Sequence, residues 1–350
     1  MRNWFLPFMA IALTLGACND GANEQAPEPE QQPEVEEQPE EEPQETEEQP
    51  VEQKAVPENF GERYFDQNDF IHAYPNALDS QFLSESIGLY MEYLVMMEDE
   101  EKFAEQYENL LDEFVVEEEE NFFINWLIFE DATVNALIDD IRIAATLREA
   151  DALFGQPEYS ETADRIIETI SRVQTNNGYT VDYYDWEVEY PAQRVTLSYL
   201  IADVPEDMNA DRLLENVDAD EVFFPEYFDV ADEVYVKNEI VHMIDQLLIA
   251  INRERIGLSS EPFEEWLKTE WEEEGRLFGR YDRESLEATV AYESLAMYFY
   301  MNEYFLVIGE DEKAEQVKDR ATEVAEANAN GETHFFDFIH YHMMMEDESK

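Results

Sequence analysis

Cysteine, glycine and basic side chains are scarce in this chain of 350 residues. It has one Cys, 11 Gly and 21 Lys and Arg, against 86 Asp and Glu. A lone cysteine forms neither an intramolecular disulfide nor a thiolate metal cluster. The formal net charge of −65 would repel phosphates, so we expect no nucleic-acid partner. No Walker motif, dinucleotide fingerprint or GxSxG elbow occurs, which argues against nucleotide-binding and serine-hydrolase classes.

Hydrophobic runs long enough to cross a bilayer are also missing. The apolar segment 4–15 follows Arg2 and has the length of a signal-peptide core. It ends in Leu15-Gly16-Ala17-Cys18, so residues 1–18 resemble a bacterial lipoprotein signal. That resemblance implies a lipid on Cys18, which would anchor the protein to the outer face of the cytoplasmic membrane. An ordinary signal peptide with an incidental cysteine is the alternative.

Residues 19–58 are of low complexity and consist mainly of Glu, Gln and Pro. The segment 20–58 holds 15 acidic residues and one basic residue, Lys54. It has almost no apolar side chains, so it cannot offset the entropy lost on ordering. Charge repulsion and prolines keep such a chain extended. We predict a disordered tether, with a cation-binding or partner-binding tail as the alternative.

The remaining residues, 59–350, are predicted to form one globular domain. Aromatic residues make up 13% of the chain, which is too many for a disordered protein and allows a sizeable core. The domain is itself strongly acidic. An acidic surface is typical of proteins that stay soluble in salty or alkaline habitats. The alternative interpretation is that the acidic surface attracts a cationic substrate. We expect a monomer.

Helix-forming residues dominate this domain, and glycine is rare within the predicted helices. The segments between them are aromatic and polar, which suggests stacked helical hairpins. No repeat of fixed length is visible, which argues against the common solenoid families. The predicted helices span residues 84–98, 101–116, 131–154, 161–175, 208–217, 235–255, 262–272, 285–306 and 311–329.

The histidines give only a weak metal signal. His340 and His342 are separated by one residue, and two ligands at that spacing do not define a site. They lie in the aromatic segment 335–342, which we interpret as a C-terminal packing segment. We therefore expect no metal and no organic cofactor.

Carboxylates beside aromatic residues are the remaining source of chemistry. Glycoside hydrolysis uses such a set: one carboxylic acid protonates the leaving oxygen, and a carboxylate activates water or attacks carbon. Aromatic faces stack on sugar rings. Because acids are abundant throughout this chain, composition alone does not select this class.

A motif narrows the choice. The segment Ser84-Glu85-Ser86-Ile87-Gly88-Leu89-Tyr90-Met91 is similar to the Ser-Glu-Gly-x-Gly-Tyr-Gly-Met signature of glycoside hydrolase family 8. Residues 140–147 resemble the second half of the family's Ala-Thr-Asp-x-Asp-Leu-x-Ile-Ala-x-Ala-Leu helix. Residues 196–200 resemble its Asn-Pro-Ser-Tyr segment. The order and spacing agree over most of residues 60–330. The resemblance extends to short, lipid-anchored family 8-like proteins of Gram-positive bacteria linked to exopolysaccharide genes.

The resemblance implies an all-α fold, the (α/α)6 barrel, and the shortness of the domain allows for one reduced hairpin. It also implies that Glu85 is the general acid at the start of an inner helix. Asp140 is a plausible second catalytic residue, and Asp245 is the nearest equivalent of the catalytic base. Two departures matter: Ile138 stands where the family has an Asp, and no Arg follows Asp245 at the family's spacing.

Each of these carboxylates has a purely structural alternative. Glu85 could instead stabilise a helix dipole in the first turn, with Ser84 as the cap. Asp140 could pair with Arg142 or Arg148, and Asp245 lies in an apolar stretch where a carboxylate needs a partner. Substrate contacts are predicted for Trp126, Asp139, Tyr183, Tyr184, Trp186, Tyr199 and Tyr281; for Tyr199 a core position is equally compatible.

Together these features predict an extracellular, lipid-anchored glycoside hydrolase. It would act on a β-linked polysaccharide, such as a β-1,4-glucan, chitosan or an exopolysaccharide, with inversion at the anomeric carbon. The alternative is a non-catalytic polysaccharide-binding or exopolysaccharide-assembly lipoprotein on the same fold. An open cleft with Glu85 and a second carboxylate would support the enzyme, and a Glu85 closed into a salt bridge would support the binding protein.

Overall fold

A computed structural model describes residues 63–75, 80–201, 210–218, 220–328 and 331–346 of the chain. The predicted signal peptide and tether, with Cys18, lie outside these described residues. Within the described ranges, no helix combines the length and the apolar character needed to cross a membrane.

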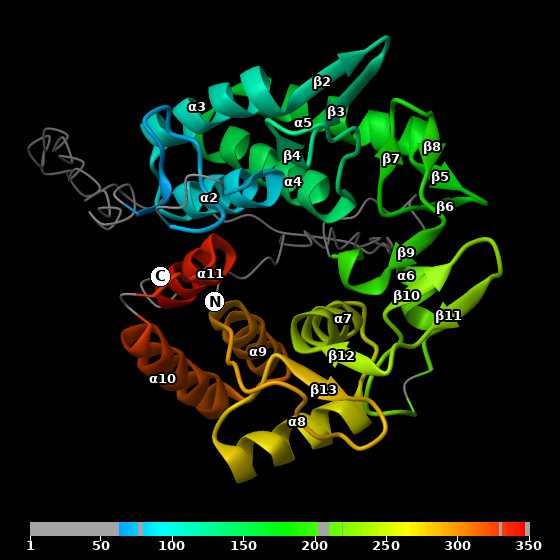
Figure 1. Cartoon of the computed structure of the whole chain (residues 1–350), viewed down its shortest axis with the longest axis vertical. Helices are drawn as coiled ribbons and strands as arrows, with labels where there is room; N and C mark the ends of the chain where they lie inside the picture. Colours follow the sequence, from blue (N-terminus) through cyan, green and yellow to red (C-terminus); the bar gives the residue numbers. More distant parts are fainter. Residues whose placement is uncertain (1–62, 76–79, 202–209, 219, 329–330, 347–350) are drawn as a thin grey trace, which may run out of the picture. The chain divides into compact units, whose positions relative to one another are not determined.

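The described chain forms a ring of inner helices, seen end-on in Figure 1. Helix α2 packs against α4, α7 packs against the 3-10 turn η2 and α9, and α11 packs against both α9 and α2. The inner elements are α2 (Ser84–Met96), α4 (Leu137–Phe154), η2 (Leu197–Tyr199), α7 (Met243–Arg255), α9 (Leu295–Val307) and α11 (Phe335–Glu346).

A second set of helices lies outside this ring, and each follows its inner partner in the chain (Figure 1). The outer elements are α3 (Glu100–Asn109) with the π-helical turn η1 (Leu110–Phe114), α5 (Pro157–Val173), α6 (Ala210–Glu215), α8 (Glu261–Glu274) and α10 (Asp311–Ala327). This alternation confirms the predicted (α/α)6 barrel. The third hairpin is reduced, because η2 and the six-residue α6 replace two full helices.

Short antiparallel strands connect the hairpins, where the sequence suggests only loops. They pair as β1–β4, β2–β3, β5–β6, β7–β8, β9–β10–β11 and β12–β13. Their bounds are β1 (Phe82–Leu83), β2 (Val115–Glu118), β3 (Asn121–Ile124), β4 (Leu127–Ile128), β5 (Thr175–Asn176), β6 (Tyr179–Thr180), β7 (Tyr184–Asp185), β8 (Tyr190–Pro191), β9 (Arg194–Thr196), β10 (Tyr227–Asp229), β11 (Val234–Val236), β12 (Ile240–His242) and β13 (Arg280–Asp282).

Three predicted helices are too long at their N-terminal ends. Helix α4 begins at Leu137 rather than 131, α7 at Met243 rather than 235, and α9 at Leu295 rather than 285. In the segment 234–242, β-branched residues favour strand pairing over helix, and this segment forms β11 and β12. The aromatic C-terminal segment, interpreted only as packing, is helix α11.

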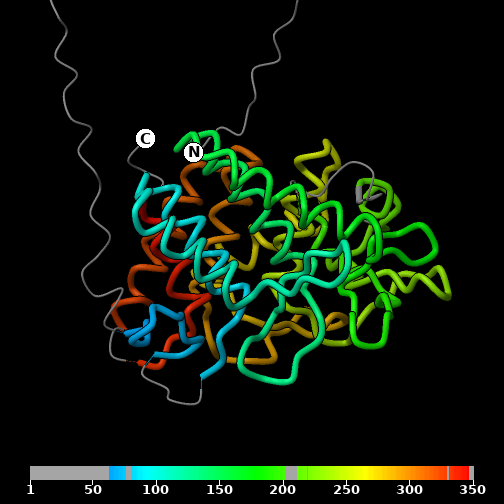
Figure 2. Tube along the Cα trace, turned by 90° about the horizontal axis from the view of Figure 1, so that it is seen from above, coloured from blue at the N-terminus to red at the C-terminus, as the bar shows by residue number. Residues whose placement is uncertain are grey.

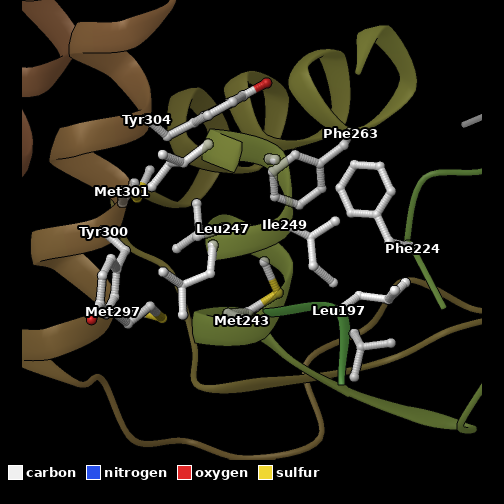
Figure 3. Close-up of a cluster of buried hydrophobic side chains, with 14 of the residues drawn as sticks. Leu197, Phe224, Met243, Leu247, Ile249, Phe263, Met297, Tyr300, Met301 and Tyr304 are labelled. Atoms are coloured by element: carbon white, nitrogen blue, oxygen red, sulfur yellow. The ribbon is translucent and has the colours of Figure 1, made fainter. Parts of the chain in front are cut away.

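The hydrophobic core falls into two clusters, and one of them joins α7 to its neighbours. In Figure 3, Met243 and Leu247 of α7 lie between Leu197 of η2 and the side chains of α9, among them Met297 and Met301. All five side chains are fully buried. Burying one such side chain contributes about 1.5–3 kcal/mol, so this packing fixes the position of α7 relative to η2 and α9.

The second cluster joins α2, α4, α5 and α11. Helices α2 and α4 approach closely at Gly88, where an added Cβ would lie 2.8 Å from Cγ1 of Ile143. This residue is the one glycine of the signature that the chain retains. Its missing side chain lets the first turns of α2 and α4, with their carboxylates, come together.

The ring closes between the beginning and the end of the described chain. The first described segment and α11 lie side by side in both views (Figures 1 and 2). The Tyr64 hydroxyl donates a hydrogen bond to the Thr333 carbonyl, and the Phe335 N–H donates to the Ala73 carbonyl. The Tyr64 ring also packs against Phe335 and Phe338. Helix α11 is therefore held from both sides.

Candidate active site

The first turns of the inner helices bring carboxylates to one end of the ring. Glu85 belongs to the first turn of α2, Asp139 and Asp140 to that of α4, Asp245 to that of α7 and Asp337 to that of α11. A carboxylate in a first turn is favoured by the helix dipole. The helix dipole acts within each helix and does not explain why these first turns lie at the same end. They do so because the inner helices are arranged in a ring.

A pocket of about 570 Å³ opens at this end. Glu85, Asp337 and Glu293 supply its carboxylates, and His242 and Arg280 supply basic groups. The remaining lining residues are Ile244, Gly279, Tyr292, Ser294, Met297, His334 and Phe336. The pocket therefore combines acidic, basic and aromatic side chains in one space.

Glu85 is the central carboxylate of this pocket. Among the described residues, its side chain makes no hydrogen bond and no ion pair, and it is only partly exposed. The pKa of Glu85 is raised to about 8, mainly by burial and also by Asp139 and Asp337, while Arg142 opposes the shift. A carboxyl group with this pKa is protonated at neutral pH, as a general acid requires.

Asp139 lies beside Glu85 and is held by the residue preceding Glu85. The Ser84 hydroxyl donates a 2.9 Å hydrogen bond to Oδ2 of Asp139. The other carboxylate oxygen, Oδ1, is buried with no hydrogen-bond partner among the described residues. Burial raises the pKa of Asp139, with Arg142 and the Ser84 hydrogen bond opposing it. Asp139 and Glu85 are thus an interacting pair.

Arg142 is the positive charge beneath this pair. Its guanidinium donates a 2.9 Å hydrogen bond to the Tyr300 hydroxyl of α9. Tyr300 in turn lies 2.9 Å from Nε2 of His340 in α11, and Nδ1 of His340 lies 2.7 Å from the Phe336 carbonyl. Burial lowers the pKa of His340 to about 3, so the ring is neutral, with Nδ1–H donating to Phe336 and Nε2 accepting from Tyr300. Three inner helices therefore hold Arg142.

Asp337 joins the first turns of α9 and α11. Its Oδ1 accepts a 2.6 Å hydrogen bond from the Ser294 hydroxyl and a 2.9 Å bond from the Ala296 N–H. Ser294 is also the N-cap of α9, because its hydroxyl oxygen accepts from the Met297 N–H. These bonds fix Asp337 in the pocket wall.

Asp245 occupies the first turn of α7 next to the reduced hairpin. Its Oδ1 accepts a 2.7 Å hydrogen bond from the Ser198 hydroxyl of η2. Burial raises the pKa of Asp245, and the Ser198 hydrogen bond and His242 oppose it. Tyr199, which follows Ser198, is partly exposed. Burial raises the pKa of Tyr199, and Asp182, Asp139 and Asp245 raise it as well, so these carboxylates lie within electrostatic range of its hydroxyl.

Asp140 is placed differently from the other carboxylates. Only 2% of it is exposed, and Oδ2 accepts a 2.6 Å hydrogen bond from the Asn135 amide. Asn135 also donates to Gln174 and accepts from the Tyr184 N–H, so Asp140 fastens the start of α4 to neighbouring loops. Like Asp139 and Asp245, it does not line the pocket. The alternative pairing with Arg142 or Arg148 is not formed either, since Arg142 bonds Tyr300 and Arg148 bonds Asp164.

The predicted aromatic contacts separate into two groups. Trp126 is partly exposed, and its carbonyl accepts from the Ser84 N–H, which places it next to the first turn of α2. Tyr184 and Trp186 stack on Phe123, with ring centroids 5.6 Å and 5.1 Å apart, and Trp186 is 9% exposed. These two rings pack against the β2–β3 hairpin.

The remaining two aromatic residues face the core to different degrees. Tyr183 is partly buried against the core cluster that contains α7. Tyr281 is fully buried, and its hydroxyl donates to Glu270 and accepts from the Phe278 N–H. A fully buried ring cannot touch a polysaccharide, so the substrate contact predicted for Tyr281 is wrong. The alternation of β13 points the ring of Tyr281 inward and its neighbour Arg280 outward.

Comparison with known proteins identifies the fold and relatives of the chain. No protein-family model matches the chain. "Putative lipoprotein YdaJ" of Bacillus subtilis (strain 168) is 32% identical over 232 residues, which are 62% of this chain. The chain spans 62% of the length of that relative. The crystal structure of PssZ from Listeria monocytogenes is 32% identical, with a TM-score of 0.75, and the match covers 81% of this chain and 92% of PssZ.

More distant structures carry the same fold. An alpha-amylase from Clostridium perfringens has a TM-score of 0.70 at 21% identity, covering 80% of this chain and 92% of that one. The endoglucanase Cel10 of Klebsiella pneumoniae, a family 8 glycosyl hydrolase, has a TM-score of 0.60 at 14% identity, covering 83% and 98%. The chain belongs to the same family as PssZ and has the six-hairpin fold of glycoside hydrolase family 8.

Several pocket residues of this family 8-like protein are not apparent from the sequence. Asp337 stands in the segment interpreted as packing, although a carboxylate in the first turn of an aromatic helix was a usable signal. From the sequence, Arg142 suggests only a partner for Asp140. Tyr292 and Glu293 are a weak example of the carboxylate-beside-aromatic pattern, and no motif marks Arg280; the fold of the ring brings these residues to one pocket.

The two C-terminal histidines of this family 8-like protein have structural roles. His340 is fully buried in the Arg142–Tyr300 network, and the His342 ring packs on Phe338 with centroids 4.5 Å apart. Among the residues that the structure describes, no group of three His, Cys, Asp or Glu side chains could hold a metal ion.

Proposed function

We propose that this chain is a glycoside hydrolase in which Glu85 is the general acid. The observation that carries the proposal is the state of Glu85. It faces a pocket, it has no ion pair among the described residues, and burial beside Asp139 and Asp337 raises its pKa to about 8. A structural carboxylate would instead be paired, as Glu293 in the same pocket is paired with Arg320.

The proposed reaction is hydrolysis with inversion. Glu85 donates its proton to the glycosidic oxygen as the bond from that oxygen to C1 breaks. A water molecule attacks C1 from the opposite face, and a carboxylate takes the proton of that water. The two carboxyl groups of an inverting enzyme lie about 6.5–9.5 Å apart to leave room for the water. No cofactor takes part in this scheme.

Asp245 is the proposed base, as the family resemblance implies. Ser198 holds one of its oxygens, and the other makes no hydrogen bond among the described residues, so it can accept a proton from water. Asp337 is a second candidate, because it lines the same pocket as Glu85 and is likewise held through one oxygen. Asp139 and Arg142 then act on Glu85 with opposite signs.

The proposed substrate is a β-linked polysaccharide outside the cell: a β-1,4-glucan, chitosan or an exopolysaccharide. Partly exposed aromatic rings offer stacking faces for sugars, among them Tyr199 and Trp126, whose backbone carbonyl bonds the Ser84 N–H. The location proposed is the outer face of the cytoplasmic membrane, with a lipid on Cys18. The name of the relative YdaJ supports this location.

A polysaccharide-binding or exopolysaccharide-assembly protein on the same fold is the second candidate. Two observations favour it: Ile138 in the first turn of α4 replaces a family carboxylate, and Asp245 lacks the following arginine. Such a protein would hold the polymer in the same pocket without cleaving it. The unpaired Glu85 favours the hydrolase over this alternative.

Reducing-end release by the full chain distinguishes the two. The substrates are barley β-glucan, carboxymethyl-cellulose, xylan, chitosan, poly-N-acetylglucosamine and, because the fold also carries an alpha-amylase, starch. Glu85→Gln removes the proton donor, and Glu101→Gln is the matched control in the first turn of the outer helix α3. The proposal is supported if the wild type and Glu101→Gln release reducing ends and Glu85→Gln does not. Release that survives in Glu85→Gln contradicts the assignment of the acid, and binding without release favours the binding protein.

A further inference from the structure

Two basic side chains stand together at one part of the pocket. His242 ends β12 and Arg280 begins β13, and the two residues are direct cross-strand partners. Cross-strand partners project from the same face of a sheet with Cβ atoms about 4.5–5.5 Å apart. Both line the pocket and both are exposed. Partial burial and the neighbouring Arg280 lower the pKa of His242, and Asp245 opposes this shift, so Arg280 is the lasting positive charge of the pair.

Arg280 has no negatively charged partner among the described residues. Among the described residues, its guanidinium makes no hydrogen bond and no ion pair. This is unusual in a chain with 86 acidic residues. Arg283, only three positions later, pairs with Glu226, and Arg320 pairs with the pocket residue Glu293. The chain therefore has many carboxylates that could pair with Arg280, but none does so in the described part of the fold.

An aromatic ring lies beside this basic pair. Tyr292 is 50% exposed and lines the pocket, and its ring lies directly on the backbone of Gly279. A Cβ at Gly279 would lie 2.2 Å from the Tyr292 ring, so only glycine permits this position. The Gly279 N–H also donates to the Tyr292 carbonyl. The ring of Tyr292 thus lies against the residue that precedes Arg280 and forms part of the pocket lining.

We propose that Tyr292, Arg280 and His242 form a subsite for a sugar that carries a negative charge. The inference rests on the proposed function and identifies the class of its substrate: an acidic polysaccharide, with a carboxylate or phosphate substituent. Tyr292 stacks on the sugar ring, and the guanidinium of Arg280 binds the anion through two parallel N–H donors. His242 contributes a further donor.

The neighbouring carboxylates do not prevent this binding. Glu293 is neutralised by Arg320, which donates to both of its oxygens at 2.8 and 2.7 Å. Asp337 is held by Ser294 and the start of α9. An acidic cleft would favour cationic sugars, whereas this subsite is predicted to favour anionic ones. A cationic amino sugar, such as those of chitosan, would be repelled by Arg280.

The histidine signals of the full chain test this subsite without any hydrolysis. The ring resonances of His242 are assigned by their loss in His242→Gln and then followed in NMR titrations. The added probes are D-glucuronate, glucose 6-phosphate, neutral D-glucose and cationic D-glucosamine. We expect saturable shifts with at least one anionic sugar, with an affinity about tenfold or more above that for glucose, as expected for a charge-assisted contact. The more effective anion identifies carboxylate or phosphate.

Variants separate the subsite from general charge effects. Arg280→Gln should abolish the shifts, whereas Arg148→Gln, an exposed arginine paired with Asp164, should retain them. Tyr292→Ala should weaken glucuronate and glucose alike. No shift with either anion, equal shifts with glucose or glucosamine, or shifts that persist in Arg280→Gln would overturn the proposal. Glu85→Gln should keep the shifts, so a chain without hydrolase activity that still shows them loses the proposed function but keeps the subsite.

Discussion

The two parts of the pocket treat charge in opposite ways. Around Glu85, largely buried carboxylates from α2 and α4 lie close together above a single arginine, Arg142. Around Arg280, the exposed guanidinium from β13 has no carboxylate partner among the described residues. Burial makes Glu85 in the first part retain a proton, and the second part carries the unpaired positive charge of Arg280. A single pocket can therefore both donate a proton and attract an anion.

The scaffold of each part explains this difference. The first turns of α2 and α4 meet where Gly88 allows close contact, and this contact shields Glu85 and Asp139 from water. The β12–β13 pair lies at the edge of the ring, where its alternating side chains point into the core and into solvent in turn. Helix ends thus supply the buried groups, and strand alternation supplies the exposed ones.

The largest effect should come from removing the proton donor. Glu85→Gln keeps the size of the side chain but cannot donate a proton to the leaving oxygen. General acid catalysis contributes about 10²–10⁴-fold, so the rate of reducing-end release should fall by that factor. A fall of similar size in the Glu101→Gln control would show that the loss is not specific to the pocket.

The charges around Glu85 should set the alkaline limit of activity. Its raised pKa means that the acid is present below about pH 8 and is lost as the pH rises through that value. Asp139→Asn removes a negative neighbour and still accepts from Ser84, so the alkaline limb of kcat/KM should move to lower pH by about one unit. Arg142→Met should move it to higher pH. Asp140→Asn, in the buried amide network, should leave the limb in place, and an equal shift there would contradict the pairing.

The basic part of the pocket should affect substrate preference rather than chemistry. Arg280→Gln should raise the KM for a carboxylated glucan about tenfold, with kcat little changed, because a charge-assisted contact is lost. The KM for a neutral glucan of the same linkage should change less than about twofold. Initial-rate measurements on both polymers test this prediction. An equal rise of KM on both polymers would show that the two parts of the pocket do not differ in the way proposed.

The smallest effect should appear in stability. The folded state holds a proton on Glu85 up to about pH 8, whereas an unfolded glutamate releases it near its ordinary pKa of 4.5. The free energy of unfolding therefore falls as the pH rises between these values. Glu85→Gln should remove this loss and raise stability by on the order of 1 kcal/mol at pH 8, but not at pH 4. Urea unfolding of both proteins at the two pH values measures the difference.

Much of the fold was predictable because the helices are long and periodic and follow a family motif. The signature placed Glu85 at the start of an inner helix, and the structure has α2 beginning at Ser84. The strands were missed, because pairs of two or three residues such as β12 and β13 have no periodicity of their own. Their pairing depends on contacts between residues about 40 positions apart.

The candidate site was less predictable than the fold. Asp139 and Asp140 are adjacent in sequence, but successive residues on a helix differ by about 100°, and the motif alignment pointed to Asp140 as the catalytic residue. The structure buries Asp140 in an amide network and turns Asp139 toward Glu85. Asp337 and Arg280 reach the pocket only through closure of the ring, which a single sequence does not reveal.

The position of α11 has a consequence for synthesis. Because Asp337 and His340 belong to the last described helix, the pocket is incomplete until α11 has been synthesised and has folded onto the earlier hairpins. An unfinished chain could form its early hairpins, but it would lack the wall that holds Asp337 and the histidine that positions Tyr300. The order of the elements along the chain thus means that the described hairpins can form before the pocket is complete.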